Sequence, residues 1–165
     1  MKYAIVYASL AGGSEQSAKV IKDKLFFEHQ IPENAISLID LNKTPTPDLK
    51  DYNKCIIGTG IYAGKANKKV LKLVQTNMDH LLQIPVYLFI CSLATGKESE
   101  SYRKVFPEKL LEHASILSFF GGMVIFKRLN FFTRFIMKMI TKSKQDVHKL
   151  NYNAIDRFIE KVINS

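Results

Sequence analysis

The chain contains 165 residues, of which 47% are hydrophobic and 24% are charged, and its formal net charge is +9. This composition is that of a folded globular protein, and the length is enough for one domain with a sizeable core. No apolar run reaches the roughly 18 residues that a membrane-spanning helix requires. The first residues lead directly into a strand rather than a signal peptide, so we expect a single cytoplasmic domain over residues 1–165.

The cysteines and histidines show no pattern of a metal or redox site. Cys55 and Cys91 lie singly in apolar, strand-like runs without CxxC spacing. We therefore expect buried, reduced thiols rather than a disulfide. The four histidines lack metal-ligand spacing, so we expect no metal site.

Apolar, strand-like runs alternate with stretches of helical periodicity along the chain. Five runs predict strands, at residues 3–8, 36–41, 54–58, 86–92 and 116–126. Apolar residues at helical spacing predict helices around residues 18–26, 70–81, 105–111 and 155–162. Residues 43–49 indicate an irregular connector between the second and third strands. This alternation predicts an α/β fold with a doubly wound parallel sheet and helices on both faces.

In such a sheet, ligands bind at the carboxyl ends of the strands, so the loops that follow the strands are the candidate binding segments. The loop after the first strand is Ser9-Leu10-Ala11-Gly12-Gly13-Ser14. A helix N-terminus has unpaired N–H groups and a partial positive charge, which suit a phosphate. The two glycines let the backbone approach an anion closely, and the two serine hydroxyls add donors. The alternative is an ordinary strand-to-helix turn in which Ser14 is the N-cap. The pattern GxxxxGKS/T is absent, which argues against ATP or GTP hydrolysis.

Two further loops follow the third and fourth strands. The first, residues 58–64, lacks the GxGxxG spacing of a dinucleotide site. We expect a flexible loop on which Tyr62 stacks against a flat ring, the alternative being a surface tyrosine. The second, beginning at Ser92, offers space and hydroxyl groups. The three loops together predict one ligand with a phosphate and a planar heteroaromatic ring, and FMN is the natural candidate. The predicted FMN-binding residues are Ser9, Leu10, Ala11, Gly12, Gly13, Ser14, Thr59, Gly60, Ile61, Tyr62, Ser92, Leu93, Ala94, Thr95 and Gly96.

Residues 5–21 resemble the flavodoxin signature, in which a hydrophobic strand ends in an aromatic residue and is followed by Ser-x-x-Gly-x-Thr and an alanine four residues later. Ser14 stands where that family usually has threonine, which keeps the hydroxyl. The resemblance covers the chain from Met1 to about Val162. It implies a flavodoxin-like five-stranded parallel sheet of order 2-1-3-4-5 and FMN as the cofactor.

Residues 134–142, Arg-Phe-Ile-Met-Lys-Met-Ile-Thr-Lys, are similar to the segment after the last core strand in the FMN-dependent protoporphyrinogen IX dehydrogenases. Those enzymes pass electrons to a quinone, so the resemblance implies a quinone and an acidic tetrapyrrole as reaction partners. Leu10 and Ala11 replace more polar residues of the dehydrogenase loop. Tyr62-Ala63 stands where an Arg-Tyr pair is expected. No catalytic acid or base is identified from the sequence.

The positive charge is concentrated near the carboxyl end. Residues 127–149 hold seven basic residues and one acidic residue, a net +6 of the +9. An insertion at about 127–144 places Arg134, Lys138 and Lys142 on one helical face. The apolar residues of the other face are Leu129, Phe132, Phe135, Ile136, Met139 and Ile140. Two interpretations stay open: a helix packed on the sheet with solvated lysines, or an amphipathic helix peripheral to the anionic inner face of the cell membrane. No recognition motif accompanies the basic residues, so we expect no nucleic-acid partner.

These observations favour an FMN-dependent oxidoreductase that oxidises protoporphyrinogen IX, or a similar substrate, with a quinone as acceptor. The alternative is a flavodoxin-type electron carrier without a substrate of its own. Typical flavodoxins are acidic and dock on basic partners, so the net charge of +9 argues against a carrier. A third hypothesis is a peripheral membrane or nucleic-acid binding module whose flavin site has decayed, and the intact first loop argues against it.

Overall fold

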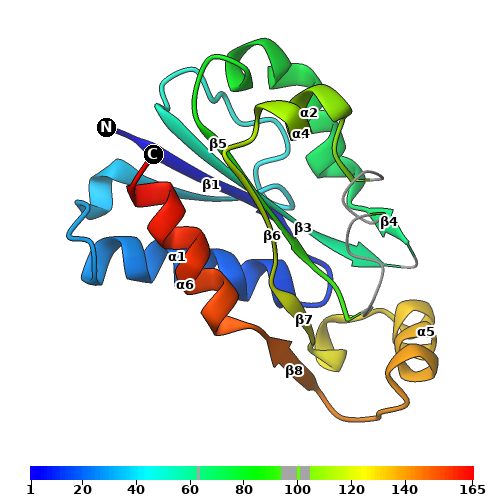
Figure 1. Ribbon diagram of the computed structural model, residues 1–165. Coiled ribbons are helices and arrows are strands. Elements are labelled where there is room, and N and C mark those ends of the chain that lie inside the picture. The colour runs from blue at the N-terminus through cyan, green and yellow to red at the C-terminus, as the bar shows by residue number, and fades with distance from the viewer. Residues whose placement is uncertain (63, 94–99, 101–104) are drawn as a thin grey trace.

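The computed structural model describes residues 1–62, 64–93, 100 and 105–165. Its centre is a parallel sheet (Figure 1) whose strands stand in the order β2-β1-β3-β5-β6. These strands are β1 (Tyr3–Ala8), β2 (Ile36–Asp40), β3 (Lys54–Tyr62), β5 (Val86–Cys91) and β6 (Ile116–Phe119). A short strand, β4 (Lys65–Ala66), folds back antiparallel against the end of β3. The predicted order of five parallel strands is therefore confirmed.

Helices cover both faces of this sheet (Figure 1). The helices of one face are α1 (Gly13–Phe27) and α6 (Tyr152–Ile163), and those of the other face are α2 (Lys68–Leu81) and α4 (Glu108–His113). Ile5 of β1 packs with α1 and α6, while the next residue, Val6, packs with α2 and α4. This is the two-residue period of a strand, and burial of both faces explains why the strands read as continuous apolar runs. The α/β doubly wound prediction is confirmed.

The third strand is longer than predicted. β3 continues to Tyr62, so the expectation of a flexible loop beginning at Gly58 is wrong. Gly58 lies directly beneath the ring of Phe89, and a Cβ atom there would stand 1.9 Å from Cζ of that ring. Glycine is therefore required by close packing between β3 and β5 and not by flexibility of the chain.

The predicted strand 116–126 is broken in two. After β6, Gly121 adopts φ 71°, and the chain continues across the carboxyl edge of the sheet as β7 (Gly121–Val124). A Cβ atom at Gly121 would lie 2.1 Å from the carbonyl oxygen of Lys149, so only glycine fits this turn. β7 pairs antiparallel with β8 (Val147–Leu150) in a separate two-stranded sheet.

The chain between β7 and β8 forms η2 (Phe126–Arg128) and α5 (Phe131–Thr141). We call residues 121–150 the edge lobe, because they project beyond the carboxyl edge of the sheet (Figure 1). The lobe and Ala11 of the first loop share a small hydrophobic cluster, which includes Val124, Phe126, Leu129 and Met137. α5 lies inside the insertion expected at about 127–144.

Two remaining expectations concern the cysteines and the connector. Cys55 and Cys91 are free and buried, as predicted. Residues 43–49 contain no helix or strand, so the irregular connector is confirmed as well.

In the part of the chain that the structure describes, no helix combines the length and the apolar character needed to cross a bilayer.

Candidate functional site

The first loop connects β1 to α1 at the carboxyl edge of the sheet. Gly12 is the N-cap residue of α1, and its φ of 107° is one that side chains disfavour. The alternative in which Ser14 caps the helix is wrong, because Ser14 lies inside the first turn of α1. Its side chain is fully buried, and its hydroxyl makes no hydrogen bond to any described residue. A buried hydroxyl without a partner is uncommon, and this one lies at the positive end of a helix.

Two backbone donors of the same loop are bound by hydroxyl groups of the chain itself. The N–H of Ala11 donates to the Tyr62 hydroxyl at 3.0 Å. The N–H of Gly12 donates to Oγ of Ser9 at 3.1 Å. Each hydroxyl oxygen therefore stands at a position where an anion oxygen could accept the same hydrogen bond.

The edge lobe lies over this loop. Gly12 forms an isolated antiparallel bridge with Val124, and the N–H of Ile125 donates to the Ala11 carbonyl at 2.8 Å. Arg128 of the lobe forms an ion pair with Glu15 of α1. As a result Ala11, Gly12, Gly13 and Ser14 are buried, and of the six predicted phosphate-loop residues only Ser9 and Leu10 reach the surface. The sequence carried no signal for this cover, because the paired residues lie more than one hundred positions apart.

Tyr62 ends β3 beneath the lobe. Its ring lies over Gly60, where a Cβ atom would stand 2.8 Å from Cε2 of the ring, and it packs against the cluster of the edge lobe. Burial raises the pKa of its hydroxyl above the ordinary value. Tyr62 is thus neither on a flexible loop nor a plain surface residue; it is a half-buried side chain bonded to the first loop.

The other predicted residues of β3 point into the fold. The Thr59 hydroxyl is buried, donates to the Gly60 carbonyl at 3.2 Å and accepts from the Asn67 N–H at 3.3 Å. The Ile61 side chain belongs to the hydrophobic cluster on the α2 side of the sheet. These two side chains support the end of the strand, and in this arrangement they are not presented to a ligand.

The end of β5 lies under the first residues of β7. The N–H of Ser92 donates to the Gly121 carbonyl at 2.7 Å, and a Cβ atom at Gly122 would stand 2.7 Å from the nitrogen of Leu93. The edge lobe therefore links this strand end to the first loop. The predicted residues Ala94, Thr95 and Gly96 lie outside the described residues.

Cys91 connects β5 to the start of α1. Its Sγ lies 3.4 Å from Oγ of Ser17, one turn after Ser14. Burial raises the pKa of the Cys91 thiol to about 11, although the hydroxyls of Ser17 and Ser14 act in the opposite direction. The thiol is therefore protonated at neutral pH, and its hydrogen-bonding partner in this structure is the Ser17 hydroxyl.

These residues fit a phosphate group in their chemistry. The loop offers backbone N–H groups, two serine hydroxyls and a helix N-terminus, and glycine at the position with positive φ. In the conformation observed here, two of the N–H groups are held by Tyr62 and Ser9. A phosphate would bind by replacing these hydroxyl oxygens as the hydrogen-bond acceptors.

A groove of about 630 Å³ opens on the other side of β1, and the sequence did not predict it. It lies between the ends of β1 and β2 and is lined by charged and aromatic side chains, including Tyr7, Glu15, Lys19, Asp40 and Lys43. Burial, followed by the nearby charges of Asp40 and Glu15, raises the pKa of Tyr7 to about 12. None of the predicted FMN-binding residues lines this groove.

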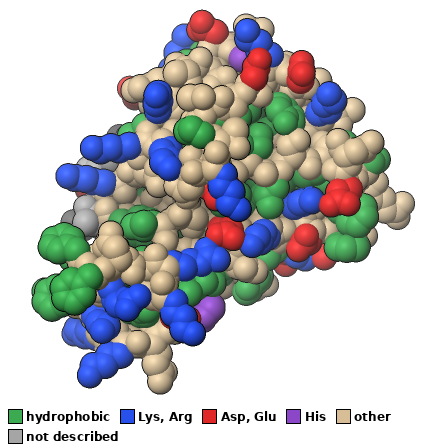
Figure 2. All heavy atoms as spheres, turned by 180° about the vertical axis from the view of Figure 1, so that it is seen from behind, with side chains coloured by type: hydrophobic (Ala, Val, Ile, Leu, Met, Phe, Trp, Pro, Cys, Tyr) green, Lys and Arg blue, Asp and Glu red, His purple; other side chains and the backbone are tan. Residues whose placement is uncertain are grey.

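α5 is amphipathic, but only part of its apolar stripe is packed against the rest of the protein. Leu129, just before the helix, is buried, whereas Phe132, Phe135 and Met139 are exposed. Figure 2 shows green side chains projecting from this end of the molecule beside a group of blue Lys and Arg side chains. The predicted stripe is therefore divided between the small cluster of the lobe and the surface.

Arg134 does not belong to a solvated row of cations. Its Nε donates to the Phe126 carbonyl at 3.1 Å, and its Nη2 donates to the Leu129 carbonyl at 3.2 Å. Lys138 and Lys142 are exposed. Arg134 thus fixes α5 to η2, and the exposed charge of the helix comes from the lysines.

Comparisons with known proteins agree with this architecture. A family model described as a flavodoxin domain matches residues 4–151. A Leishmania major protein named protoporphyrinogen IX dehydrogenase (quinone) is 24% identical over 170 residues, which cover 95% of this chain and 72% of that protein.

Solved structures show the same fold. A flavodoxin from the domain Archaea is similar over 99% of this chain and 95% of its own, with 16% identity and a TM-score of 0.53. Rubredoxin oxygen:oxidoreductase from the anaerobe Desulfovibrio gigas is similar over 98% of this chain, with 13% identity and a TM-score of 0.55. This chain spans 37% of that larger protein. The family match supports FMN as the cofactor. Because that match extends over residues 4–151 of a chain that has the corresponding sheet order and first loop, the chain belongs to the flavodoxin domain family.

Proposed function

We propose that this protein is an FMN-dependent oxidoreductase whose first loop holds the FMN phosphate. The observation that carries the proposal is the Ser14 hydroxyl, which is fully buried at the start of α1 and has no partner among the described residues. A phosphate oxygen at this point would provide its missing hydrogen bond. Membership of the flavodoxin domain family supports the same ligand.

Within this proposal, the chain's own residues bind and orient the cofactor. The backbone N–H groups of Ala11 and Gly12 and the hydroxyls of Ser9 and Ser14 would hold the phosphate. Tyr62, at the end of β3, and residues 92–96, which follow β5 in the sequence, would flank the ring. The edge lobe covers the loop and excludes water from it. When bound, FMN supplies one- and two-electron chemistry that side chains cannot perform.

We further propose that the electrons pass from a porphyrinogen to a quinone. The printed name of the Leishmania major relative, which matches 95% of this chain, describes that reaction. For each pair of electrons and protons that leaves the porphyrinogen, one quinone would become a quinol. The net charge of +9 suits a substrate with carboxylate groups. A flavodoxin-type carrier is the second candidate, and the same charge argues against it because such carriers are acidic.

The test has two stages. Purified protein is first titrated with FMN, and binding is followed by quenching of flavin fluorescence. We expect one FMN to bind to each chain. If the protein binds no flavin, both the FMN site and the proposed reaction are wrong. The loaded protein is then mixed anaerobically with protoporphyrinogen IX and a menaquinone analogue. A flavin-dependent rise in porphyrin fluorescence is expected, whereas rapid electron exchange with a protein partner and no such rise would favour the carrier.

A further inference from the structure

The outer face of α5 carries large apolar side chains that the fold does not use. Phe131 is 89% exposed, Phe132 72%, Phe135 60% and Met139 67%. At 3.6 residues per turn these four positions fall within about 100° of the helix circumference. They therefore form one continuous strip, which we call the phenylalanine ridge.

The ridge is held outward by specific contacts. The Asn130 side chain caps α5 by accepting from the Thr133 N–H at 2.9 Å, and Arg134 bonds two carbonyl groups of the preceding segment. Met137, on the opposite side of the helix, is buried in the cluster of the lobe. Rotation of α5 to bury the ridge would break these contacts. Exposure of the ridge is thus a property of the folded lobe.

Exposed cations surround the ridge. Lys138 and Lys142 are exposed and lie four positions apart, so they share one side of α5. Lys127, before the helix, and Lys144, after it, are exposed as well. The one acidic residue of positions 127–149, Asp146, accepts a hydrogen bond from the Phe126 N–H at 2.8 Å. Figure 2 shows a group of blue Lys and Arg side chains next to the green apolar ones at this end of the molecule. An apolar strip inside a positively charged rim is complementary to a surface that is apolar within and anionic at its boundary.

We propose that the phenylalanine ridge inserts into an anionic lipid bilayer and docks the edge lobe on the membrane surface. Phenylalanine and methionine side chains enter the boundary between headgroups and acyl chains, while the lysines contact lipid phosphates. This inference does not rest on the proposed function. If both hold, docking brings the carboxyl edge of the sheet to the phase in which lipid-soluble quinones are dissolved.

The observations favour a bilayer over other partners. A second copy of the chain would present the same cations to this face, and like charges oppose such pairing. Figure 2 shows apolar side chains that project from this end of the molecule, a shape that suits insertion. A polyanion such as nucleic acid would be attracted by the lysines but would leave the ridge unused.

The main experiment places a reporter in the ridge. The chain contains no tryptophan, so a Phe132→Trp variant carries a single indole. With phosphatidylcholine vesicles that contain phosphatidylglycerol, we expect a blue shift of its emission and quenching by brominated lipid. A Phe27→Trp variant, which places the indole at an exposed position at the end of α1, is the matched control and is expected to show neither change. Equal behaviour of the two variants would overturn the proposal.

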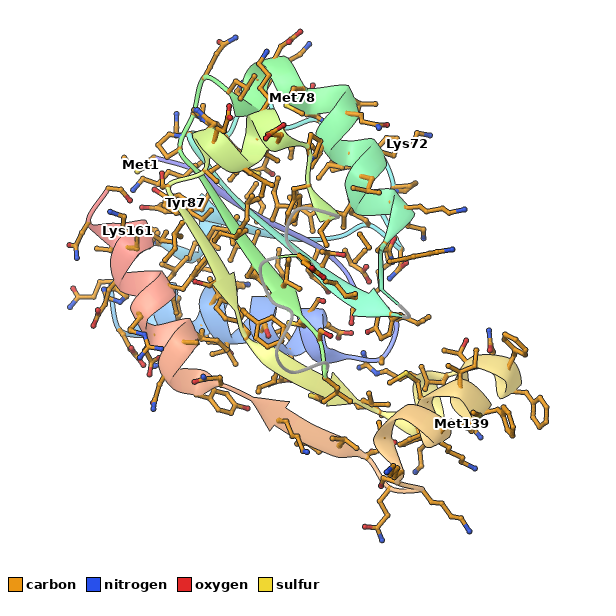
Figure 3. The ribbon with its side chains drawn as sticks, turned by 45° about the vertical axis from the view of Figure 1, so that its right-hand side comes forward. Met1, Lys72, Met78, Tyr87, Met139 and Lys161 are labelled. Carbon is orange, nitrogen blue, oxygen red and sulfur yellow. The ribbon has the colours of Figure 1, made fainter. Side chains whose placement is uncertain are left out.

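Cosedimentation with the same vesicles separates the two parts of the surface. A Phe131→Ser, Phe132→Ser, Phe135→Ser variant is expected to bind about tenfold more weakly or worse. In a Lys138→Gln, Lys142→Gln, Lys144→Gln variant, the affinity for the vesicles is expected to fall about fivefold for each lysine removed. The control replaces lysines far from α5, namely Lys50, Lys72 and Lys161, two of which are labelled in Figure 3 well away from Met139.

The outcomes are distinct. Losses in both α5 variants with little loss in the control support membrane docking. If only the lysine variant loses binding, the face is a general polyanion surface and the proposal is wrong. If the wild-type protein does not bind the vesicles but DNA or a protein binds the ridge, the proposal is also wrong. None of these measurements requires flavin, so failure here leaves the proposed oxidoreductase untouched.

Discussion

Aromatic side chains have opposite environments in the central sheet and in the edge lobe. Phe89, Phe120 and Phe158 are fully buried beside the sheet, with ring centroids 4.9 Å apart for the first two and 5.2 Å for the last two. Phe131 and Phe132 of α5 stand in solvent. Burial of one such side chain contributes about 1.5–3 kcal/mol to folding. The exposed phenylalanines of the lobe therefore do not contribute the stability that the buried ones contribute. This indicates that the surface of the lobe serves an interaction outside the fold.

The two regions also differ in how they are held together. The sheet has large clusters on both faces, whereas the lobe has one small cluster and a few polar contacts. Stability in proteins is uneven, and elements with few buried contacts open more readily than the core. Because the lobe covers the first loop, access to the predicted phosphate site depends on the less stable of the two regions.

The largest expected effect separates the two regions by stability. In Gly58→Ala, the added Cβ would meet the Phe89 ring at 1.9 Å, and that ring is held by other aromatic rings. We expect the free energy of unfolding to fall by about 3 kcal/mol or more. In Phe135→Ser the change is expected to stay within about 0.5 kcal/mol, since the side chain is exposed. Urea denaturation of both variants checks this, and comparable losses would contradict the contrast.

The sequence predicted the sheet well because its signal is local. Continuous apolar runs located all five parallel strands, and the three central strands, β1, β3 and β5, are buried on both faces. The errors occurred at glycines. Gly58 looked like a loop residue but lies under Phe89, and Gly121 turns the chain inside what read as one strand. In both cases the reason is a neighbour from another part of the chain.

The position of the first loop was predicted from the sequence, but its contacts were not. The first loop and the start of α1 lie where the serine and glycine pattern indicated. Its contacts with Tyr62 and with the edge lobe join residues 51 and 113 positions apart, for which a single sequence holds no local signal. The periodicity of α5 was predicted too, but periodicity alone does not determine which face of a helix is buried.

The second prediction tests whether the first loop serves a ligand or only the fold. Ser14 has no hydrogen bond to lose, so Ser14→Ala should change the free energy of unfolding of the flavin-free protein by less than about 0.5 kcal/mol. A hydrogen bond to a charged group contributes about 1.5–3 kcal/mol. FMN affinity should therefore fall about tenfold or more, as measured by fluorescence titration.

Ser17→Ala is the matched control, because Ser17 is equally buried on the next turn of α1 but contacts Cys91. It should affect stability more than it affects FMN affinity. If Ser14→Ala binds FMN like the wild type, Ser14 has no part in a phosphate site.

The third prediction concerns the contact that joins the end of β3 to the first loop beneath the lobe. Tyr62→Phe removes the hydroxyl that accepts from the Ala11 N–H but keeps the ring. We expect the flavin-free protein to lose about 1 kcal/mol of stability, since one hydrogen bond is lost. The N–H becomes available to a phosphate oxygen, so FMN affinity should rise by up to about fivefold. Weaker FMN binding in this variant would show that the hydroxyl assists the ligand and does not compete with it.

The smallest effect concerns the ion pair between Glu15 of α1 and Arg128 of the lobe. The hydrogen bond with Arg128 is the main cause that lowers the pKa of Glu15 below its ordinary value of 4.5. A carboxyl group whose pKa is depressed in the folded state adds stability above its unfolded pKa and loses it as the pH falls through the folded value. Arg128 is 42% exposed, so solvent limits the contribution at pH 7 to about 0.5 kcal/mol.

We expect Glu15→Gln to be less stable than the wild type by about this amount at pH 7 and equally stable once the pH falls below the folded pKa of Glu15. Lys19 also bonds Glu15, so a double-mutant cycle with Arg128→Gln is needed to isolate the pair. Urea denaturation at several pH values measures both quantities. A coupling of zero would mean that the ion pair does not hold the lobe over the first loop. In that case the backbone contacts of Ala11 and Gly12 with Ile125 and Val124 would be sufficient to close it.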